Sequence, residues 1–377
     1  MAAAPARALA IAHTEASLGW GGQEIRTLTE AAGLAARGHR VTIYAARGAR
    51  LVGEAPRYGL AAVELPIGRK RIGGICALAR EFDLRRFDVV NAHSSTDAWL
   101  AALACAWLRA RKRPAPALVR TRHVSIAVPN DPATRWLYRR ASARIVTTGD
   151  ALRDQLVRDN GVDPRHVVSV PTGIDAARFA PRARAEARTE LGLDPAPAWI
   201  GIVATLRSWK GHRYLIDALP RLAQRDARLA VVGDGPQRAA LEAQVAAAGL
   251  SGRVLFAGQR NDVERWLPAF DVFVLPSWAN EGVPQALLQA MLAGVPCVTT
   301  AVGAIPEIAR DGETAVVVAA KDPVALAAGI DRVLADRVAA SAMAARAREL
   351  VSTRYALSGM LDRMEQVFAE AVTEAAR

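Results

Sequence analysis

The sequence predicts an α/β fold made of two doubly wound domains, each with a parallel sheet covered by helices on both faces. The chain has 377 residues, enough for two domains of ordinary size, and 51% of them are hydrophobic, so that each domain can bury a core. Short apolar runs alternate with amphipathic stretches of helical length, which is typical of strand–helix–strand units. The alternation is interrupted once by a charged segment and then begins again.

The first half contains seven apolar runs that are expected to form strands. Helical patterns lie between most of them, as over residues 23–37, 96–109 and 151–160. The expected strands cover residues 8–13, 41–45, 62–65, 88–93, 117–122, 145–148 and 167–170.

The segment Gly19-Trp20-Gly21-Gly22 follows the first expected strand and precedes a helix. Glycines at this place, Gly21 and Gly22 above all, allow the backbone to approach a ligand closely. The spacing is not GxGxxG, and no acidic residue follows the second strand at the right distance, so a dinucleotide site is not supported. The alternative is an ordinary turn between strand and helix.

Residues 180–197 are charged, have proline at both ends and contain one short helical piece, which indicates a linker between domains. After it the alternation resumes, and from about residue 324 the pattern is helical almost to the end. The expected strands cover residues 199–204, 229–233, 254–257, 271–275, 297–300 and 315–318. Ligands of such sheets bind beyond the carboxyl ends of the strands.

The net charge of +12 is unevenly distributed along the chain. Residues 1–180 carry 27 Lys and Arg against 15 Asp and Glu, whereas the remaining residues carry 22 of each. A basic half of this kind attracts anionic surfaces through long-range, salt-sensitive forces. An anionic membrane or a phosphorylated lipid acceptor, nucleic acid, and a merely solvated Arg-rich surface are the three alternatives; no nucleic-acid-binding motif is present, so no nucleic-acid partner is expected. The basic clusters are 69–71, 109–113 and 135–140.

The sequence contains no apolar run of the roughly 20 residues that a membrane-spanning helix needs, and its start is interpreted as a strand instead of a signal peptide. A cytoplasmic location, with peripheral binding to the inner membrane as an option, is therefore expected. Cys76, Cys105 and Cys297 are far apart and lie in apolar stretches, so they are interpreted as small buried residues and not as a disulfide or zinc framework.

The segment NEGVPQALLQAMLAGVPCVTT, residues 280–300, places a carboxylate in a Gly/Pro turn before an apolar helix. A helix N-terminus offers backbone N–H groups and a partial positive charge that suit a diphosphate. The separation of Glu281 from Gln289 is about two helical turns, so both side chains could line one wall of a pocket. A sugar nucleotide has a matching layout of hexose, diphosphate, ribose and base. The alternative role for Glu281 is to stabilise the helix dipole.

Two further groups of residues follow strands and could carry chemistry. Arg207 and Lys210 come after the strand at 199–204, where two cations could converge on one diphosphate and neutralise the charge of a leaving group; exposed surface cations are the alternative. His123 ends a strand and could bond to a hydroxyl or a phosphate, as could His93 with a weaker signal, although a lone histidine is often structural. No serine or cysteine hydrolase motif is present.

Taken in order, several segments resemble the glycosyltransferases of family 4, whose fold is GT-B: two Rossmann-like domains that face each other across a cleft. The segments are GWGGQE (19–24), PTGID (171–175), TLRSWKG (205–211), VVGDGP (231–236), the segment 280–300 and GAIPEIARDG (303–312). The resemblance covers nearly the whole chain. It departs from the family in two places, because Gln289 stands where the family has a second Glu and Pro284 removes one backbone N–H group.

The resemblance implies a retaining glycosyltransferase that moves a hexose-type sugar from a nucleotide-diphosphate sugar to a hydroxyl of a cell-envelope glycan or glycolipid of the lipopolysaccharide or exopolysaccharide type. Residues 1–180 would bind the acceptor, residues 198–350 the donor, and a last helix at about 352–377 would pack back on the first domain. Catalysis is assigned to Glu281, His123, Arg207 and Lys210, and substrate binding to these cations and Glu281 with Gly21, Gly22, Gly282, Val283 and Gln289. Glu281 would contact the donor sugar and Gln289 the ribose. No cofactor and no metal are expected, since the sequence has no DxD motif.

Two alternatives stay open. One class of sugar-nucleotide epimerases shares the GT-B fold, and such an enzyme would convert the donor without an acceptor. A non-catalytic sugar-nucleotide-binding protein is the other alternative, which Gln289 allows and which the presence of Glu281, Arg207 and Lys210 disfavours.

Overall fold

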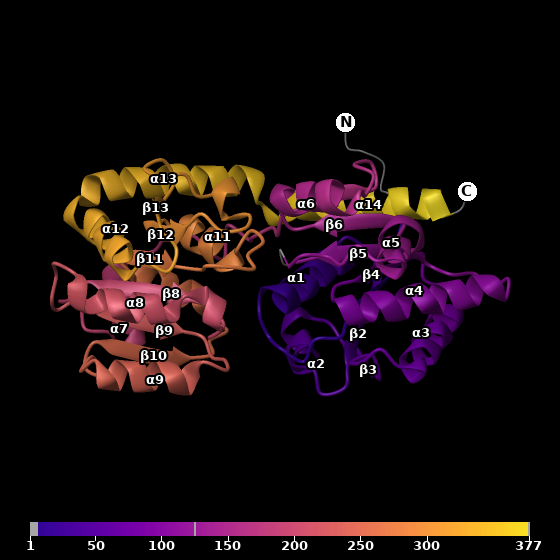
Figure 1. The fold of residues 1–377 in the computed structure, drawn as a ribbon, viewed down its shortest axis with the longest axis horizontal. Helices are drawn as coiled ribbons and strands as arrows, with labels where there is room; N and C mark the ends of the chain where they lie inside the picture. Colours follow the sequence, from indigo (N-terminus) through magenta and orange to yellow (C-terminus); the bar gives the residue numbers. More distant parts are fainter. Residues whose placement is uncertain (1–6, 124–125, 376–377) are drawn as a thin grey trace. The chain divides into compact units, whose positions relative to one another are not determined.

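The computed structural model describes residues 7–123 and 126–375, which divide into two compact units. The first unit holds the chain up to Pro171 together with the segment from Met360 onward, and the second holds Thr172–Gly359. Each unit contains one sheet in which every pair of neighbouring strands is parallel. The predicted α/β fold with two parallel sheets is confirmed (Figure 1).

The first unit has a seven-stranded sheet in the order β3-β2-β1-β4-β5-β6-β7. Each predicted strand is present, with ends that differ by two residues at most. The strands are β1 (Ala10–Glu15), β2 (Arg40–Ala46), β3 (Ala62–Leu65), β4 (Val89–Ala92), β5 (Ala117–Arg122), β6 (Arg144–Thr147) and β7 (Val167–Ser169).

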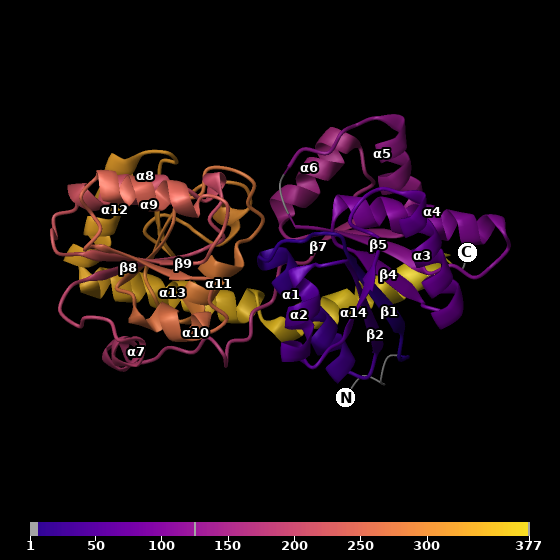
Figure 2. The ribbon, with the colours of Figure 1, turned by 90° about the horizontal axis from the view of Figure 1, so that it is seen from below.

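Helices cover both faces of this sheet; in Figure 2, α4 and α5 lie on one side and α14 on the other. Leu28, Leu78 and Val90 belong to the continuous apolar core between sheet and helices. The helices are α1 (Gly22–Ala36), α2 (Arg50–Glu54), α3 (Ile72–Arg85), α4 (Ser95–Ala110), α5 (Pro132–Trp136), α6 (Asp150–Asn160) and α14 (Leu357–Ala375), with the shorter turns η1 (Ala55–Tyr58) and η2 (Leu137–Ala141).

The final helix, α14, packs against the first unit from Met360 onward. Glu365 of this helix accepts hydrogen bonds from Arg37 and His39 at 2.8 Å each. A Cβ added to Gly33 would lie 2.5 Å from the side chain of Leu361, so any larger residue on α1 would force this leucine of α14 to shift. The end of the chain is therefore an integral part of the first unit.

The second unit has a six-stranded sheet in the order β10-β9-β8-β11-β12-β13. In Figure 2, α8 and α9 cover one face, and α10 and α13 cover the other. The strands are β8 (Trp199–Val203), β9 (Arg228–Val232), β10 (Val254–Gly258), β11 (Val272–Leu275), β12 (Cys297–Thr300) and β13 (Val316–Val318). The helices are α7 (Arg184–Leu191), α8 (His212–Ala218), α9 (Arg238–Ala247), α10 (Val263–Trp266), α11 (Gln285–Leu292), α12 (Pro323–Ala335) and α13 (Arg337–Arg354), with the turns η3 (Ser208–Lys210), η4 (Leu219–Arg221), η5 (Leu267–Ala269) and η6 (Ile305–Glu307).

The charged stretch interpreted above as a linker, residues 180–197, contributes α7 to the second unit. Arg188 of α7 is buried and forms an ion pair with Asp271, and its Nε donates to the carbonyl of Ala269 at 3.0 Å. Asp271 also accepts a bond from the amide of Trp199 at 2.7 Å. The charge of Arg188 is thus used for packing, which composition alone does not reveal.

Burial of the cysteines is only partly as expected. Cys105 and Cys297 are buried, but Cys76 on α3 is exposed. Within the described ranges 7–123 and 126–375, no helix is both long enough and apolar enough to cross a membrane.

Candidate active site

Three loops of the second unit meet where the strand order reverses. The chain adds strands outward from β8 in one direction and from β11 in the other. Such switch points, beyond the carboxyl ends of the strands, are the usual ligand sites of doubly wound sheets. The amide and the indole N–H of Trp278, after β11, donate to the carbonyls of Trp209 and Ser208, after β8, at 2.8 and 2.9 Å. The amide of Ala304, after β12, donates to the carbonyl of Glu281 at 3.3 Å.

Glycine is required at two points where these loops touch. Gly211 has a φ of +77°, and a Cβ added there would lie 2.0 Å from the carbonyl oxygen of Pro276. Gly303 has a φ of +60°, and its added Cβ would lie 2.1 Å from the carbonyl oxygen of Glu281. Both positions combine a left-handed backbone with a contact too close for any side chain. The loops around Glu281 therefore need these two glycines in order to pack against each other.

Glu281 and Lys210 form an ion pair between the loops that follow β11 and β8. The Nζ of Lys210 lies 2.7 Å from Oε1 of Glu281, and the hydroxyl of Ser277 donates to the same oxygen at 2.6 Å. Glu281 is 4% exposed, whereas the side chain of Lys210 keeps 21% of its surface. The carboxylate is thus fixed inside the loops, while the ammonium group reaches solvent.

Arg207 lies in the same turn as Lys210, and the Lys210 amide donates to the Arg207 carbonyl at 3.1 Å. Its guanidinium is exposed and lies over the ring of Trp209, 5.4 Å from the centroid. The two predicted cations therefore project from one turn. Within the described chain, an ion pair to Glu281 is made by Lys210 and not by Arg207.

The expected helical spacing of Glu281 and Gln289 is wrong. α11 begins at Gln285, after Pro284, so Glu281 lies in the preceding loop and only Gln289 lies on the helix, in its second turn. Gly282 and Val283 are buried in that loop, and Gln289 is partly exposed. Proline at 284 ends the loop in an extended conformation, with φ −74° and ψ 122°, which delays the start of the helix.

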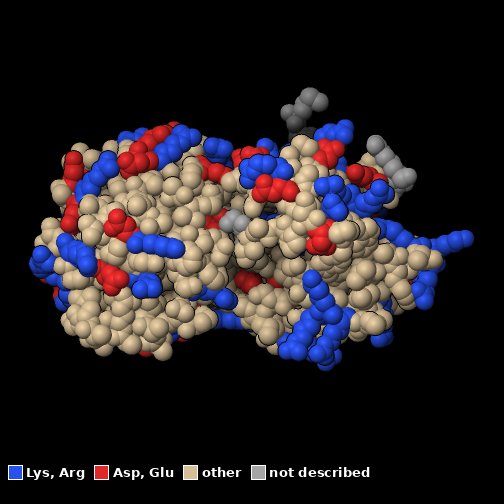
Figure 3. Space-filling view, in the orientation of Figure 1, with Lys and Arg blue, Asp and Glu red and all other residues tan. Residues whose placement is uncertain are grey.

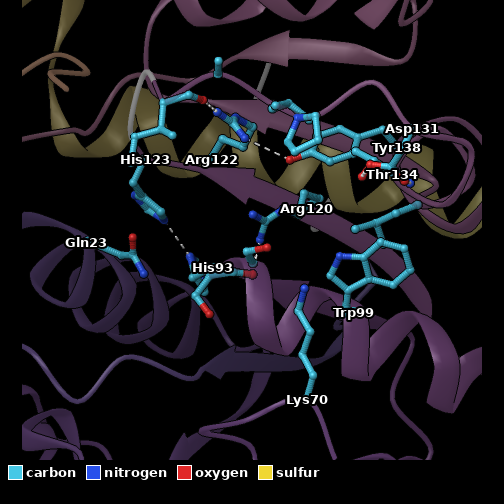
Figure 4. A pocket seen from close by; sticks show the side chains of 17 residues that line it. Gln23, Lys70, His93, Trp99, Arg120, Arg122, His123, Asp131, Thr134 and Tyr138 are labelled. Atoms are coloured by element: carbon cyan, nitrogen blue, oxygen red, sulfur yellow. Dashed lines mark hydrogen bonds between the residues drawn. The ribbon is translucent and has the colours of Figure 1, made fainter. Parts of the chain in front are cut away.

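His123 belongs to a chain of three histidines in the first unit. Nδ1 of His13 lies 2.9 Å from Nε2 of His93, and Nδ1 of His93 lies 3.0 Å from Nε2 of His123. His13 is on β1, His93 follows β4 and His123 follows β5, so the three meet at the switch point between β1 and β4. His13 and His93 are buried, and His123 is half-buried. Figure 4 shows the contact between His93 and His123.

The three imidazoles are neutral at pH 7 because the protein lowers their pKa values. Burial lowers the pKa of His13 to about 3. Burial, followed by the charges of nearby groups, lowers the pKa of His93 and of His123 well below 6.5; for His123 these groups are Arg26, Arg120 and Arg122. A neutral imidazole has one donor and one acceptor nitrogen. The three histidines can therefore form a series of hydrogen bonds that all run in one direction, from His13 through His93 to His123.

The glycine-rich segment lies beside this histidine chain. Gly21 caps α1, and Gly22 is the exposed first residue of that helix. The side-chain Nε2 of Gln23, the next residue, donates to Oε2 of Glu15 at 2.6 Å. Burial, together with Asp97 and Glu24, raises the pKa of Glu15, so this carboxyl tends toward its protonated form. Gln23 also reaches a cavity that His93 and His123 line.

That cavity of the first unit has a volume of about 690 Å³ (Figure 4). Its lining comes from β5 and the loops that follow β4 and β5, from the segment just before α3, and from α1, α4, α5 and η2. The described residues that line it are Gln23, Lys70, His93, Ser94, Ser95, Trp99, Arg120, Arg122, His123, Ile126, Ala127, Val128, Pro129, Asp131, Thr134, Leu137 and Tyr138.

Several of these side chains were not singled out from the sequence. Arg120 and Arg122 alternate with Thr121 at the end of β5, directly before His123, and this cluster of cations was the signal that could have indicated them.

In the second unit, His212 follows the glycine of the WKG segment and was also missed. It is buried, neither of its ring nitrogens has a hydrogen-bond partner in the described chain, and burial lowers its pKa to about 3.

Comparison with known proteins identifies the family. Glycosyltransferase Family 4 matches residues 20–178, and Glycosyl transferases group 1 matches residues 197–336. A D-inositol 3-phosphate glycosyltransferase of Geodermatophilus obscurus is 31% identical over 327 residues, which are 79% of this chain and 70% of that relative. This chain belongs to the family 4 glycosyltransferases.

Another relative of this family 4 chain is the lipopolysaccharide core biosynthesis mannosyltransferase LpsB of Rhizobium meliloti, which is 34% identical over 235 residues, or 59% of this chain and 64% of that relative. The matched regions thus span about two thirds of the length of these two relatives. A glycosyltransferase from Rickettsia africae superimposes with a TM-score of 0.84 at 20% identity, over 97% of this chain and 99% of the other. HepE of Anabaena, in complex with UDP-glucose, gives 0.84 at 19% identity, over 96% and 99%. These likenesses establish the fold, which is GT-B.

Proposed function

We propose that this protein is a retaining glycosyltransferase that moves a hexose-type sugar from a nucleotide-diphosphate sugar to a hydroxyl of a cell-envelope glycan or glycolipid. The observation that carries the proposal is the contact between Lys210 and Glu281 at the switch point of the second sheet. A relative that transfers mannose in lipopolysaccharide core biosynthesis and a structural neighbour with bound UDP-glucose support the substrate class.

In the proposed reaction, the second unit binds the donor. Lys210 and Arg207 project from one turn toward solvent, and they neutralise the charge that grows on the diphosphate as it leaves. Glu281 is held rigidly by Ser277 and accepts hydrogen bonds from the donor sugar. Gly282, Val283 and the start of α11 surround the phosphates, and Gln289 contacts the ribose. These cations supply the positive charge, so the transfer is proposed to proceed without a metal ion.

The first unit binds the acceptor in this scheme. His123 is partly accessible in the cavity and exchanges a hydrogen bond with a substrate hydroxyl, while His93 and His13 behind it fix the orientation of its ring. Gly21 and Gly22 let the backbone come close to substrate at the start of α1. The acceptor hydroxyl attacks the face that the diphosphate leaves, and its proton passes to a phosphate oxygen, so no enzymic nucleophile is required.

A panel of UDP-, GDP- and ADP-sugars tests this proposal. We expect one donor class to raise the melting temperature of the full chain, and the same donor to yield a glycoside with retained configuration when hydroxyl acceptors are added. Product configuration is read by NMR. An epimerised donor in the absence of acceptor would identify an epimerase, binding without any product would identify a binding protein, and no binding at all would refute a sugar-nucleotide site.

A second proposal concerns an anionic membrane surface near the end of α4. Leu103 and Trp107, one helical turn apart, are 39% and 41% exposed, and the guanidinium of Arg111 lies 3.9 Å from the centroid of the Trp107 ring. Lys112 and Arg113 follow directly. Apolar side chains edged by cations suit the headgroup region of a bilayer. Figure 3 shows Lys and Arg gathered in patches on the visible face of the first unit.

Vesicle binding tests this surface. We expect the protein to sediment with phosphatidylglycerol vesicles at low salt, and the double variant R111Q/K112Q to bind about fivefold more weakly for each charge removed. The matched control is R158Q on α6, where the arginine is also exposed. Binding that is absent at low salt, or that is unaffected in the double variant, would exclude this membrane site.

A further inference from the structure

The cavity of the first unit carries an excess of positive charge. Among the described residues that line it, Lys70, Arg120 and Arg122 are cationic and Asp131 is the one carboxylate. Asp131 lies at the start of α5, where it accepts bonds from the amide and the hydroxyl of Thr134 at 2.9 and 2.7 Å. Its charge is therefore engaged at the helix end, and it is the one carboxylate among the described lining residues, against three cations.

Arg120 is the most unusual of these cations because it is 5% exposed. One of its terminal nitrogens donates to the carbonyl of Ser94, its Nε has no hydrogen-bond partner in the described chain, and Arg120 forms no ion pair with a carboxylate of the described chain. The charge of Arg120 counteracts the effect of burial on the pKa of Asp97. The oxygens of Asp97, however, accept hydrogen bonds from Ser94, Thr14 and the amide of His93. A buried guanidinium without a paired anion is costly, so the cavity is prepared for an anion from outside.

The positive charges of Arg120 and Arg122 change the pKa values of neighbouring side chains. The hydroxyl of Tyr138 accepts a bond from Arg122 at 3.0 Å. Burial on its own raises the pKa of Tyr138, but the charges of Arg120 and Arg122, together with the hydrogen bonds from these two arginines, outweigh burial and lower it overall. The same two cations add to the effect of burial on His123, which lies on the same wall. These charges therefore act across the cavity.

An aromatic surface completes the cavity. Trp99 of α4 lines it and stacks on Trp136 of α5, with ring centroids 6.0 Å apart and planes 27° apart. The ammonium of Lys70 lies 5.3 Å from the Trp99 centroid. In Figure 4 the charged end of Lys70 points up between His93 and Trp99, toward Arg120. A cavity with a flat ring on one side and converging cations on the other suits a sugar ring that carries an anionic group.

We propose that this cavity binds a phosphomonoester on the acceptor sugar, held by Lys70, Arg120 and Arg122, with the sugar ring against Trp99. This inference rests on the proposed function, since it names the chemistry of the acceptor. A phosphate dianion matches several cations better than a single carboxylate does, and Arg binds phosphate oxygens through paired N–H groups. The phosphate belongs either to a soluble sugar phosphate or to a phosphorylated glycolipid.

Calorimetric binding to the full chain tests the inference with glucose 6-phosphate, inorganic phosphate, glucuronate and glucose as probes. The double variant R207Q/K210Q serves as background, so that phosphate cannot bind at the proposed donor site. We expect saturable binding of glucose 6-phosphate that K70Q weakens about tenfold and that the matched control R71Q leaves unchanged. K70Q is the decisive variant, because Lys70 is exposed and its loss does not endanger folding, whereas the buried Arg120 is needed in the core.

Three results would each overturn the inference. Glucose 6-phosphate could bind the K70Q chain as tightly as the background chain, glucuronate could bind more tightly than glucose 6-phosphate, or glucose 6-phosphate could show no saturable binding. The proposed function is judged separately by donor binding to the second unit, which K70Q must leave intact. Transfer assays then separate the two sources: glucose 6-phosphate in solution, and a phosphorylated glycolipid in phosphatidylcholine vesicles. Transfer to either source that requires Lys70 supports the inference, and failure with both contradicts it.

Discussion

Replacing Lys210 with glutamine is expected to reduce the kcat of sugar transfer by about 10²–10³-fold, because a fixed charge at the leaving group stabilises the transition state more than the ground state. Lys210 is suited to this role by its position. Its Nζ is held 2.7 Å from Glu281 at the switch point of the second sheet and still reaches solvent. A donor that brings two phosphates would give this ammonium a second partner without displacing the loop.

The kinetic pattern distinguishes this role from simple binding. A loss confined to KM for the donor would mean that Lys210 holds the ground state equally well, whereas a fall in kcat means that its charge matters as the bond breaks. R213Q is the matched control, since Arg213 is an exposed cation on the next helix, three residues away. Unchanged kcat and donor KM in K210Q would remove Lys210 from the mechanism.

Glu281 complements this test. The substitution Glu281→Gln keeps a side chain of the same shape that can accept the bond from Ser277, but it removes the negative charge opposite Lys210. We therefore read E281Q together with K210Q in a double-mutant cycle. A non-additive result would show that the two residues act as a unit on the donor.

The strands could be predicted from the sequence because buried parallel strands appear as short apolar runs between turn residues. The switch points then follow from the order of the strands. The sequence also indicated Lys210 and Glu281 separately, Lys210 from its position after a strand and Glu281 from its Gly/Pro turn before an apolar helix. Their direct contact could not be read from the sequence, because the two residues are 71 positions apart and lie on loops whose close packing, with glycine at 211 and 303, is a tertiary feature.

Other features escaped sequence reasoning for identifiable reasons. Arg120 lies within a β-strand, and a charged residue in a strand is normally assigned to a solvated face; here it is buried because its guanidinium turns to the carbonyl of Ser94. His13 is a single histidine within an apolar first strand. Its role is visible only through its contact with His93, which in turn contacts His123, and both of these follow other strands. Glu281 was placed on a helical spacing because the delay caused by Pro284 is a backbone effect with no periodic signature.

The last prediction concerns the core beneath the histidine chain. Arg26 and Glu30 are one turn apart on α1, their side chains are both 0% exposed, and Nε of Arg26 lies 3.4 Å from Oε2 of Glu30. Arg26 also donates to the carbonyl of Val170 at 2.7 Å, and the side-chain Nδ2 of Asn91 donates to Oε1 of Glu30 at 3.0 Å. This network joins α1 to β4 and to the end of β7 inside the first unit.

We expect R26M to lower the free energy of unfolding of the first unit by about 3–5 kcal/mol, because it leaves the Glu30 carboxylate buried without its cation. The double variant R26M/E30L should recover much of that loss, since no buried charge is then left unpaired. The readouts are urea unfolding of the full chain and hydrogen exchange of the β1 and β4 amides, which assigns the change to this unit.

R50M provides the matched control, because Arg50 and Glu54 have the same order and spacing on α2 but the arginine side chain is 42% exposed, and an exposed pair of this kind contributes little. A loss in R26M no larger than that in R50M would contradict the prediction.

The R26M variant also affects the histidines of the site, because burial and then the charges of nearby groups, Arg26 among them, lower the pKa of His93. If R26M folds, NMR titration of His93 should therefore show a higher pKa than in the parent chain, which would connect the buried pair of α1 to the protonation of the histidines that orient His123.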